Sequence, residues 1–276
     1  MSSGGERYAD IQVGKSKLRM HYVAVGDAGT PLLLIHGFGG CLENWRALLP
    51  ALGRRFRVYA IDLPGFGRSD ALAAHHRFED MVHAVGAFIK TFDLASLTVV
   101  GHSFGGLVAV ELARLNQSRV DRLVLVDSAG AQVATPLDRP SMRVALRYPL
   151  LGRLIIRALT ADRAFPRVVR RMVADEGRLN EEQLAALRAG VRQMHLPPTG
   201  RASWVIERFL DRVAQVPCFT LVLWGAEDQV IPVEQGVAIF KRLQHGQMQV
   251  VESCGHVMPM ECPEEMLGAL FQFLQE

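Results

Sequence analysis

The chain has 276 residues, which suffices for one large domain or two small ones with a substantial buried core. Apolar residues make up 49% of the sequence and charged residues 21%, as in an ordinary soluble globular protein. The formal net charge of +3, without a basic stripe interleaved with aromatic residues, argues against nucleic-acid binding. No stretch approaches the roughly 20 apolar residues of a membrane span, and residues 1–7 lack the apolar core of a secretory signal, so we expect a cytoplasmic protein.

The N-terminal quarter of the sequence predicts several strands separated by turns. Residues 18–25 alternate apolar and polar side chains, which predicts an antiparallel edge strand after a short one at 11–13. Residues 31–35 are continuously apolar, which is typical of a buried central strand. This strand leads into His36–Gly40, a loop whose glycines allow backbone N–H groups to face a pocket. A further strand is predicted at 56–61.

The sequence Gly101-His102-Ser103-Phe104-Gly105 lies between a predicted strand at 97–100 and a predicted helix at 106–115. A strand that turns directly into a helix forces one residue into a strained backbone conformation, and small residues are needed on either side. G-x-S-x-G in this context predicts a nucleophile elbow, which exposes the Ser103 hydroxyl beside a helix N-terminus.

A serine hydroxyl needs a base to remove its proton and an acid to orient that base. The predicted strand at 219–225 is followed by Asp228, and the shorter one at 248–252 by His256. The order Ser, Asp, His is the order expected in an α/β hydrolase. The sequence therefore predicts Ser103 as nucleophile, His256 as base and Asp228 as acid.

Two other aspartates are alternatives for the acid. Asp62 precedes the nucleophile in the chain, which breaks the expected order, so we interpret it as a carboxylate that braces its loop. Asp127 lies in the predicted sixth strand at 122–128, but the Asp228 segment is favoured because Trp-Gly precedes it and a proline follows it. His36 is interpreted as a structural histidine of its loop.

These segments resemble the α/β-hydrolase superfamily, in the lid-containing branch of serine hydrolases that includes carboxylesterases, lipases and the meta-cleavage product C–C hydrolases. The resemblance rests on His36–Gly40 with Trp45, on Asp62–Ser69, on the elbow, and on the segments of Asp228 and His256. It implies an α/β fold with a mostly parallel eight-stranded sheet flanked by helices, and a helical lid inserted after the sixth strand.

The resemblance divides the chain into a first core part at 1–134, a lid at 135–205 and a second core part at 206–276, which ends in a helix at 263–274. Strand-like runs disappear in the lid segment, where arginines, helix formers and prolines dominate. Residues 146–159 are apolar with interspersed arginines, which favours a lid helix packed on the core. Contact with an acyl chain or docking on an anionic membrane are the alternatives.

The resemblance also implies roles around the nucleophile. The backbone N–H groups of Phe38 and Phe104 are expected to form the oxyanion hole. The possible pocket-lining residues are Gly37, Gly39, His102, Val230 and Val257.

Four cysteines, Cys41, Cys218, Cys254 and Cys262, show no C-x-x-C spacing and are expected as reduced thiols. Cys254 lies two positions before His256, but no set of ligands with zinc spacing completes a site there. The sequence therefore predicts no metal and no organic cofactor.

The favoured function is hydrolysis of a small-molecule carboxylic ester with an apolar acyl or alcohol part, through an acyl-enzyme on Ser103. The first alternative is a C–C hydrolase of products of aromatic ring meta-cleavage. Many enzymes of that group have asparagine where this chain has His102 and an aromatic residue where it has Val257, although Asn44 and the lid arginines suit a carboxylate-bearing substrate. Cofactor-free perhydrolases and small-molecule receptors with this fold are further alternatives.

Overall fold

The computed structural model describes residues 7–14, 16–72, 77–130, 149–194 and 208–275. Residues 1–6, which the sequence analysis considered for a secretory signal, lie outside these ranges. So do residues 135–148 and 195–205, the two ends of the predicted lid. In the described ranges, no helix combines the length and the apolar character that crossing a bilayer requires.

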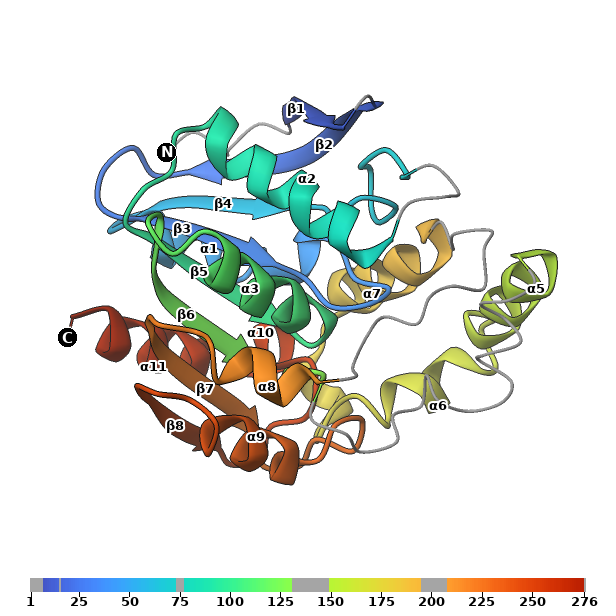
Figure 1. The fold of residues 1–276 in the computed structure, drawn as a ribbon. Helices are drawn as coiled ribbons and strands as arrows, with labels where there is room; N and C mark the ends of the chain where they lie inside the picture. Colours follow the sequence, from blue (N-terminus) through green and yellow to red (C-terminus); the bar gives the residue numbers. More distant parts are fainter. Residues whose placement is uncertain (1–6, 15, 73–76, 131–148, 195–207, 276) are drawn as a thin grey trace.

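An eight-stranded sheet forms the centre of the molecule, in the order β1-β2-β4-β3-β5-β6-β7-β8 (Figure 1). The strands are β1 (Arg7–Val13), β2 (Ser16–Val25), β3 (Pro31–Ile35), β4 (Arg57–Ile61), β5 (Leu97–His102), β6 (Val120–Val126), β7 (Phe219–Gly225) and β8 (Gly246–Val251). The β1–β2 and β2–β4 pairs are antiparallel and all other pairs are parallel. The predicted fold, a mostly parallel eight-stranded sheet with flanking helices, is confirmed.

Helices cover both faces of this sheet, because the side chains of its central strands alternate between two apolar clusters. In β3, Leu33 and Ile35 belong to a cluster that includes residues of α2, α3, α8 and α9, whereas Leu32 and Leu34 belong to one that includes residues of η1, α1, α10 and α11. The bounds of these helices are η1 Leu42–Trp45, α1 Leu49–Leu52, α2 Phe78–Thr91, α3 Phe104–Leu115, α8 Phe209–Val213, α9 Val233–Phe240, α10 Met258–Glu261 and α11 Pro263–Gln275.

Between β6 and α8, the described residues 149–194 contain helices and no strand. The helices are α5 (Pro149–Leu159), α6 (Phe165–Val169), η3 (Glu176–Arg178) and α7 (Glu181–Gln193). In Figure 1 they lie beyond the C-terminal ends of the parallel strands. They contribute to a third apolar cluster, formed by Phe165, Val169, Val173, Leu179 and Leu187 together with Val257 and Met260. We refer to residues 149–194 as the helical insertion.

Several element boundaries differ from those predicted. Strand β5 continues to His102 and α3 begins at Phe104, so that the turn between them is a single residue, Ser103. The spacing of the apolar residues predicts a helix at 81–92, but α2 begins at Phe78. The Asp80 carboxylate accepts the Arg77 N–H at 2.7 Å, a capping contact that apolar periodicity does not reveal.

Candidate active site

Ser103 has a backbone conformation that residues other than glycine seldom adopt, with φ 51° and ψ −117°. Its neighbours in the G-x-S-x-G sequence must be small for steric reasons. A Cβ atom on Gly101 would lie 2.5 Å from the Gly105 carbonyl oxygen, and one on Gly105 would overlap the Ile35 carbonyl oxygen. The two glycines therefore allow β5, α3 and β3 to meet closely, and Ser103 takes the strained position between strand and helix.

The three residues predicted as nucleophile, base and acid lie in one hydrogen-bonded line. Ser103 Oγ lies 3.0 Å from His256 Nε2, and His256 Nδ1 lies 2.7 Å from Asp228 Oδ2. The residues are 8%, 5% and 6% exposed, respectively. The other oxygen of Asp228 accepts the N–H groups of Val230 and Ile231 at 2.7 and 2.8 Å, which fixes the carboxylate. This arrangement can transfer the serine proton to the imidazole while the carboxylate orients the ring.

Asp127, the alternative acid, contacts the sheet backbone. It is fully buried after β6, and its Oδ1 atom accepts the Gly225 N–H at 2.8 Å. Burial and the nearby charge of Asp228 raise the pKa of Asp127 well above its ordinary value. A raised pKa disfavours the charged form that would stabilise an imidazolium, which favours Asp228 for this task.

Asp62 braces its own loop, in agreement with its interpretation from the sequence. Its Oδ1 atom accepts the Leu42 N–H at 2.7 Å, and its Oδ2 atom lies 2.7 Å from His21 Nδ1 and accepts the Arg68 N–H at 2.8 Å. Burial alone would raise the pKa of Asp62, but the hydrogen bond from His21 and the other contacts outweigh it and lower the pKa.

His36 also has a structural environment. Its Nδ1 atom lies 2.7 Å from the Gly37 carbonyl oxygen, and its Nε2 atom accepts the Leu63 N–H at 3.0 Å. Burial lowers the pKa of His36, so the ring is held neutral between the two loops.

His102, predicted to line the pocket, holds the backbone of the base. Its Nε2 atom lies 2.6 Å from the His256 carbonyl oxygen, and its ring meets the Trp45 indole edge-on at 6.4 Å between centroids. Burial, and then the neighbouring His256, lower the pKa of His102 to about 3. The neutral ring therefore donates its Nε2–H to the peptide of His256. The sequence did not indicate this role, because the two residues are 154 positions apart.

The glycine-rich loop after β3 lies between the elbow and the helical insertion. A Cβ atom on Gly37 would lie 3.0 Å from the Cβ atom of Ser103, so this loop passes directly over the nucleophile. Gly39 has φ 71°, and a Cβ atom on Gly190 of α7 would lie 2.6 Å from the Gly39 carbonyl oxygen. The rings of Phe38 and Phe104, whose N–H groups are the expected oxyanion donors, meet edge to face at 6.1 Å.

The two remaining residues predicted to line the pocket lie in different clusters. Val230 is half-buried and packs against the cluster that contains α2 and α3. Val257 is buried in the third cluster, with Val173 and Leu187 of the helical insertion.

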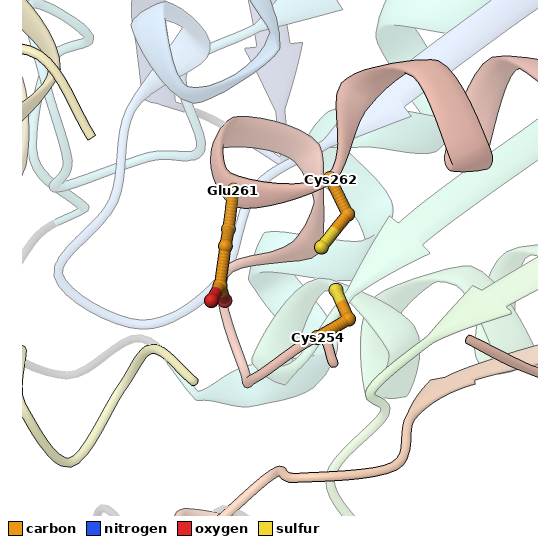
Figure 2. Close-up of side chains that lie close together, drawn as sticks. All are labelled: Cys254, Glu261 and Cys262. Atoms are coloured by element: carbon orange, nitrogen blue, oxygen red, sulfur yellow. The ribbon is translucent and has the colours of Figure 1, made fainter. Parts of the chain in front are cut away.

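Within the described part of the chain, Cys254, Glu261 and Cys262 form one group of three potential metal ligands, whose ligand atoms lie within 4.8 Å of one another (Figure 2). Their polar atoms already have partners. Both oxygens of Glu261 accept backbone N–H groups, and Arg178 Nη1 donates to Cys262 Sγ at 3.3 Å. The hydrogen bond from Cys254 and then this guanidinium lower the pKa of Cys262. A bound cation would have to displace these donors, so the geometry suits a hydrogen-bonded cluster.

Similarity to known proteins supports this fold. A family model described as alpha/beta hydrolase fold matches residues 30–263. The 2-hydroxymuconate semialdehyde hydrolase of Pseudomonas sp. strain CF600 is 33% identical over 258 residues, 90% of this chain and 88% of its own. The dihydrolipoyllysine-residue acetyltransferase component of the acetoin cleaving system of Pseudomonas putida is 32% identical over 96% of this chain and 68% of its own.

Among solved structures, a thermophilic esterase from Thermogutta terrifontis has a TM-score of 0.78 and 25% identity, with 98% of both chains covered. Relatives of this kind carry different activities on one scaffold, so similarity establishes the family and the general class of hydrolase rather than the substrate. The family model alone covers most of the chain. The chain belongs to the α/β-hydrolase family.

Proposed function

We propose that the chain is a serine hydrolase that cleaves carboxylic esters of small molecules, with Ser103 as nucleophile, His256 as base and Asp228 as the acid that orients it. The observation that carries the proposal is the continuous line of hydrogen bonds from Ser103 Oγ through His256 to Asp228 Oδ2, with distances of 3.0 and 2.7 Å. The strained backbone of Ser103 supports it, since such strain clusters at functional sites.

In the proposed reaction, His256 Nε2 accepts the Ser103 proton while Ser103 Oγ attacks the ester carbonyl carbon. The tetrahedral intermediate collapses, and His256 returns the proton to the departing alcohol. A water molecule then loses a proton to His256 and attacks the acyl-enzyme, which releases the carboxylic acid and restores Ser103. Asp228 keeps the Nδ1–H tautomer and stabilises the imidazolium in both steps.

The oxyanion hole in this proposal consists of the backbone N–H groups of Phe38 and Phe104. Phe104 is the first residue of α3, where N–H groups and the helix dipole favour negative charge. Removing one such donor typically costs about 3 kcal/mol of transition-state stabilisation. Phe38 belongs to the glycine-rich loop that passes over Ser103, which suits it for the second donor.

Residues 135–205 are proposed as the lid, between core parts at 1–134 and 206–276. Its described portion supports this role because Gly190 and Val191 of α7 pack on Gly39, directly beside the proposed oxyanion loop. A helical segment in that position determines which substrates reach the nucleophile.

Hydrolysis of a C–C bond is the second candidate, favoured by the 33% identity to the 2-hydroxymuconate semialdehyde hydrolase. Two features favour the ester instead. Many C–C hydrolases have asparagine at the position of His102, whose ring in this chain is hydrogen-bonded to the His256 carbonyl oxygen. An aromatic residue is common in them at the position of Val257, which in this chain is buried among residues of the insertion.

A substrate panel tests the proposal. We expect turnover of p-nitrophenyl esters of graded chain length, and loss of that turnover by at least about 1,000-fold in Ser103→Ala with an unchanged melting temperature, because the substitution removes only a small hydroxyl group. Activity on a dienoic diketo acid without activity on any ester would replace the first candidate by the second. Ester hydrolysis at the wild-type rate in Ser103→Ala would overturn the assignment of the nucleophile.

A further inference from the structure

Glu261, at the end of α10, is a buried carboxylate with no part in the proposed reaction. The residue is 4% exposed, and its side chain projects from the helix beside the two thiols (Figure 2). Its Oε2 atom accepts the Gly255 N–H at 2.8 Å, one residue before His256. Its Oε1 atom accepts the N–H groups of Ala174 and Asp175 at 2.7 and 2.9 Å, and both residues belong to the helical insertion.

The two segments that Glu261 joins also meet through their backbones. The His256 N–H donates to the Met172 carbonyl oxygen at 2.7 Å, and a Cβ atom on Gly255 would lie 2.7 Å from Val173 Cα. Farther along the insertion, Gln183 Nε2 donates to the Met260 carbonyl oxygen at 2.9 Å. The loop that carries the base is therefore in direct contact with residues 172–175 of the insertion.

The backbone of His256 is held from two sides. Its N–H group is bound by the insertion, and its carbonyl group accepts a hydrogen bond from His102 in the elbow at 2.6 Å. The Glu261 carboxylate strengthens the contact with the insertion, because it accepts N–H groups from both segments and hydrogen bonds to an ionised acceptor are stronger than neutral ones.

We propose that Glu261 is a positioning residue, which holds the loop of His256 against residues 172–175 and so keeps the imidazole within reach of Ser103. This inference rests on the proposed function. It makes the helical insertion part of the support of the base, in addition to its proposed role above the pocket. A displacement of about 1 Å at a reacting group can cost about 100-fold in rate, so a contact of this kind is large enough to matter.

The test compares Glu261→Gln with a matched control, Glu111→Gln. Glutamine retains one acceptor oxygen but places an NH₂ group against at least one of the three backbone donors. Glu111 is 5% exposed and forms ion pairs with Arg114 and Arg212 at 2.8 and 3.1 Å, on α3 and α8. Its substitution removes a carboxylate of similar burial that touches neither the base loop nor the insertion.

We expect Glu261→Gln to lower kcat for the preferred p-nitrophenyl ester by about 10- to 100-fold with KM changed less than about threefold, because the base is displaced while the substrate site is intact. Glu111→Gln should change kcat by less than about threefold. A purely structural role would lower the melting temperature of both variants and leave kcat of the folded protein unchanged. Wild-type kcat in folded Glu261→Gln, or an equal fall in both variants, would overturn the proposal.

Hydrogen–deuterium exchange gives a readout that does not depend on activity. In Glu261→Gln, amides of residues 172–175 and 253–257 should exchange faster together while those of β5 keep their protection. Unchanged exchange in both segments would contradict the role of Glu261 even if the ester reaction is confirmed. If Ser103→Ala retains activity, the proposed function fails and the exchange result still decides whether Glu261 joins the two segments.

If Glu261→Gln does not yield folded protein, Gln183→Ala tests the same joint from the insertion side. Gln183 is half-buried, and its substitution removes the hydrogen bond to the Met260 carbonyl oxygen of α10 together with the one that its Oε1 atom accepts from the Asn180 N–H at the start of α7. We expect a fall in kcat of about two- to fivefold and faster exchange at residues 253–257. Wild-type values of both quantities would overturn the proposal.

Discussion

At the scale of single residues, Ser103 combines a strained backbone with a hydrogen-bonded side chain. Ser103 has φ 51° without the freedom of glycine, which typically costs of order 1–3 kcal/mol. Gly101 and Gly105 remove the steric conflict that would otherwise add to this cost, and Gly106 lies so close to Ser128 that it too has no room for a side chain. The fold therefore stabilises one orientation of the buried Ser103 hydroxyl group toward His256.

The two candidate acids differ in their contacts, since Asp228 bonds to His256 and Asp127 to the sheet backbone, which leads to a prediction. We expect Asp228→Asn to lower kcat by about 100- to 10,000-fold, because the amide loses the charge that stabilises the imidazolium and favours the wrong tautomer. Asp127→Asn should lower kcat by less than about tenfold, because Asp127 contacts the sheet backbone and the amide oxygen still accepts the Gly225 N–H. Steady-state kinetics on the ester that the wild type turns over measure both; the opposite ranking would move the acid to the end of β6.

The sequence was sufficient to predict that Ser103, Asp228 and His256 lie together, because each follows a predicted strand and the carboxyl ends of parallel strands meet at one edge of the sheet. It was not sufficient for the residues that support them. His102 reaches a carbonyl 154 positions away, and Glu261 binds N–H groups 86 and 87 positions before it. These contacts involve backbone atoms of their partners, which leave no signature in residue type.

At the scale of elements, the strands were predictable from continuous apolar runs, since the central strands are covered on both sides. Short elements were not. Helices α1 and α10 have four residues each, too few to show a helical period, although α10 carries Glu261. The helical composition of the segment that contains α5, α6 and α7 was enough to predict a lid. It could not predict the contact of this segment with the loop of His256, because that contact joins parts of the chain that are far apart in sequence.

Two helical glycines provide a matched test of how closely α3 packs. A Cβ atom on Gly105 in α3 would overlap the Ile35 carbonyl oxygen, whereas one on Gly268 in α11 would meet no atom within 4 Å. We expect Gly105→Ala to lower the free energy of unfolding by about 1–3 kcal/mol or more, since backbone must move. Gly268→Ala should raise it by about 0.5–1 kcal/mol through helix propensity.

Urea unfolding at equilibrium measures both glycine variants against the wild type. The opposite signs matter more than the magnitudes, because both substitutions add one methyl group to a helix. A Gly105→Ala protein as stable as the wild type would show that α3 can move away from β3, and would weaken the argument that close packing fixes Ser103.

At the scale of the whole molecule, the site lies where three apolar clusters meet. Phe104 belongs to the cluster beneath α2 and α3, Cys254 to the one beneath α11, and Val257 to the cluster of the insertion. Burial on this scale places His102, which precedes Ser103 in the chain, and His36, in the loop after β3, in an environment that excludes their charged forms. His36 and His102 both have lowered pKa values for this reason.

Such histidines make stability depend on pH in a definite direction. The pKa of His102 falls from 6.5 in a free chain to about 3 in the folded protein. Above pH 6.5 the ring is neutral in both states, and its contribution is complete. As the pH falls from 6.5 toward 3, the unfolded chain binds a proton that the folded protein does not, so the free energy of unfolding decreases, by up to about 1.4 kcal/mol per pH unit. His36 acts in the same direction.

The free energy of unfolding should therefore begin to fall at a pH well above the pKa of ordinary carboxyl groups. His102→Gln should make its dependence on pH less steep. Glutamine can donate to the His256 carbonyl without titrating, so the slope of unfolding free energy against pH between 6.5 and 5 should fall. Urea titrations at pH 7.5, 6.5 and 5.5 measure the slope. His83→Gln, on the exposed face of α2, is the control and should retain the wild-type slope. Equal slopes in both variants would mean that His102 is charged in the folded protein, in conflict with its burial against His256.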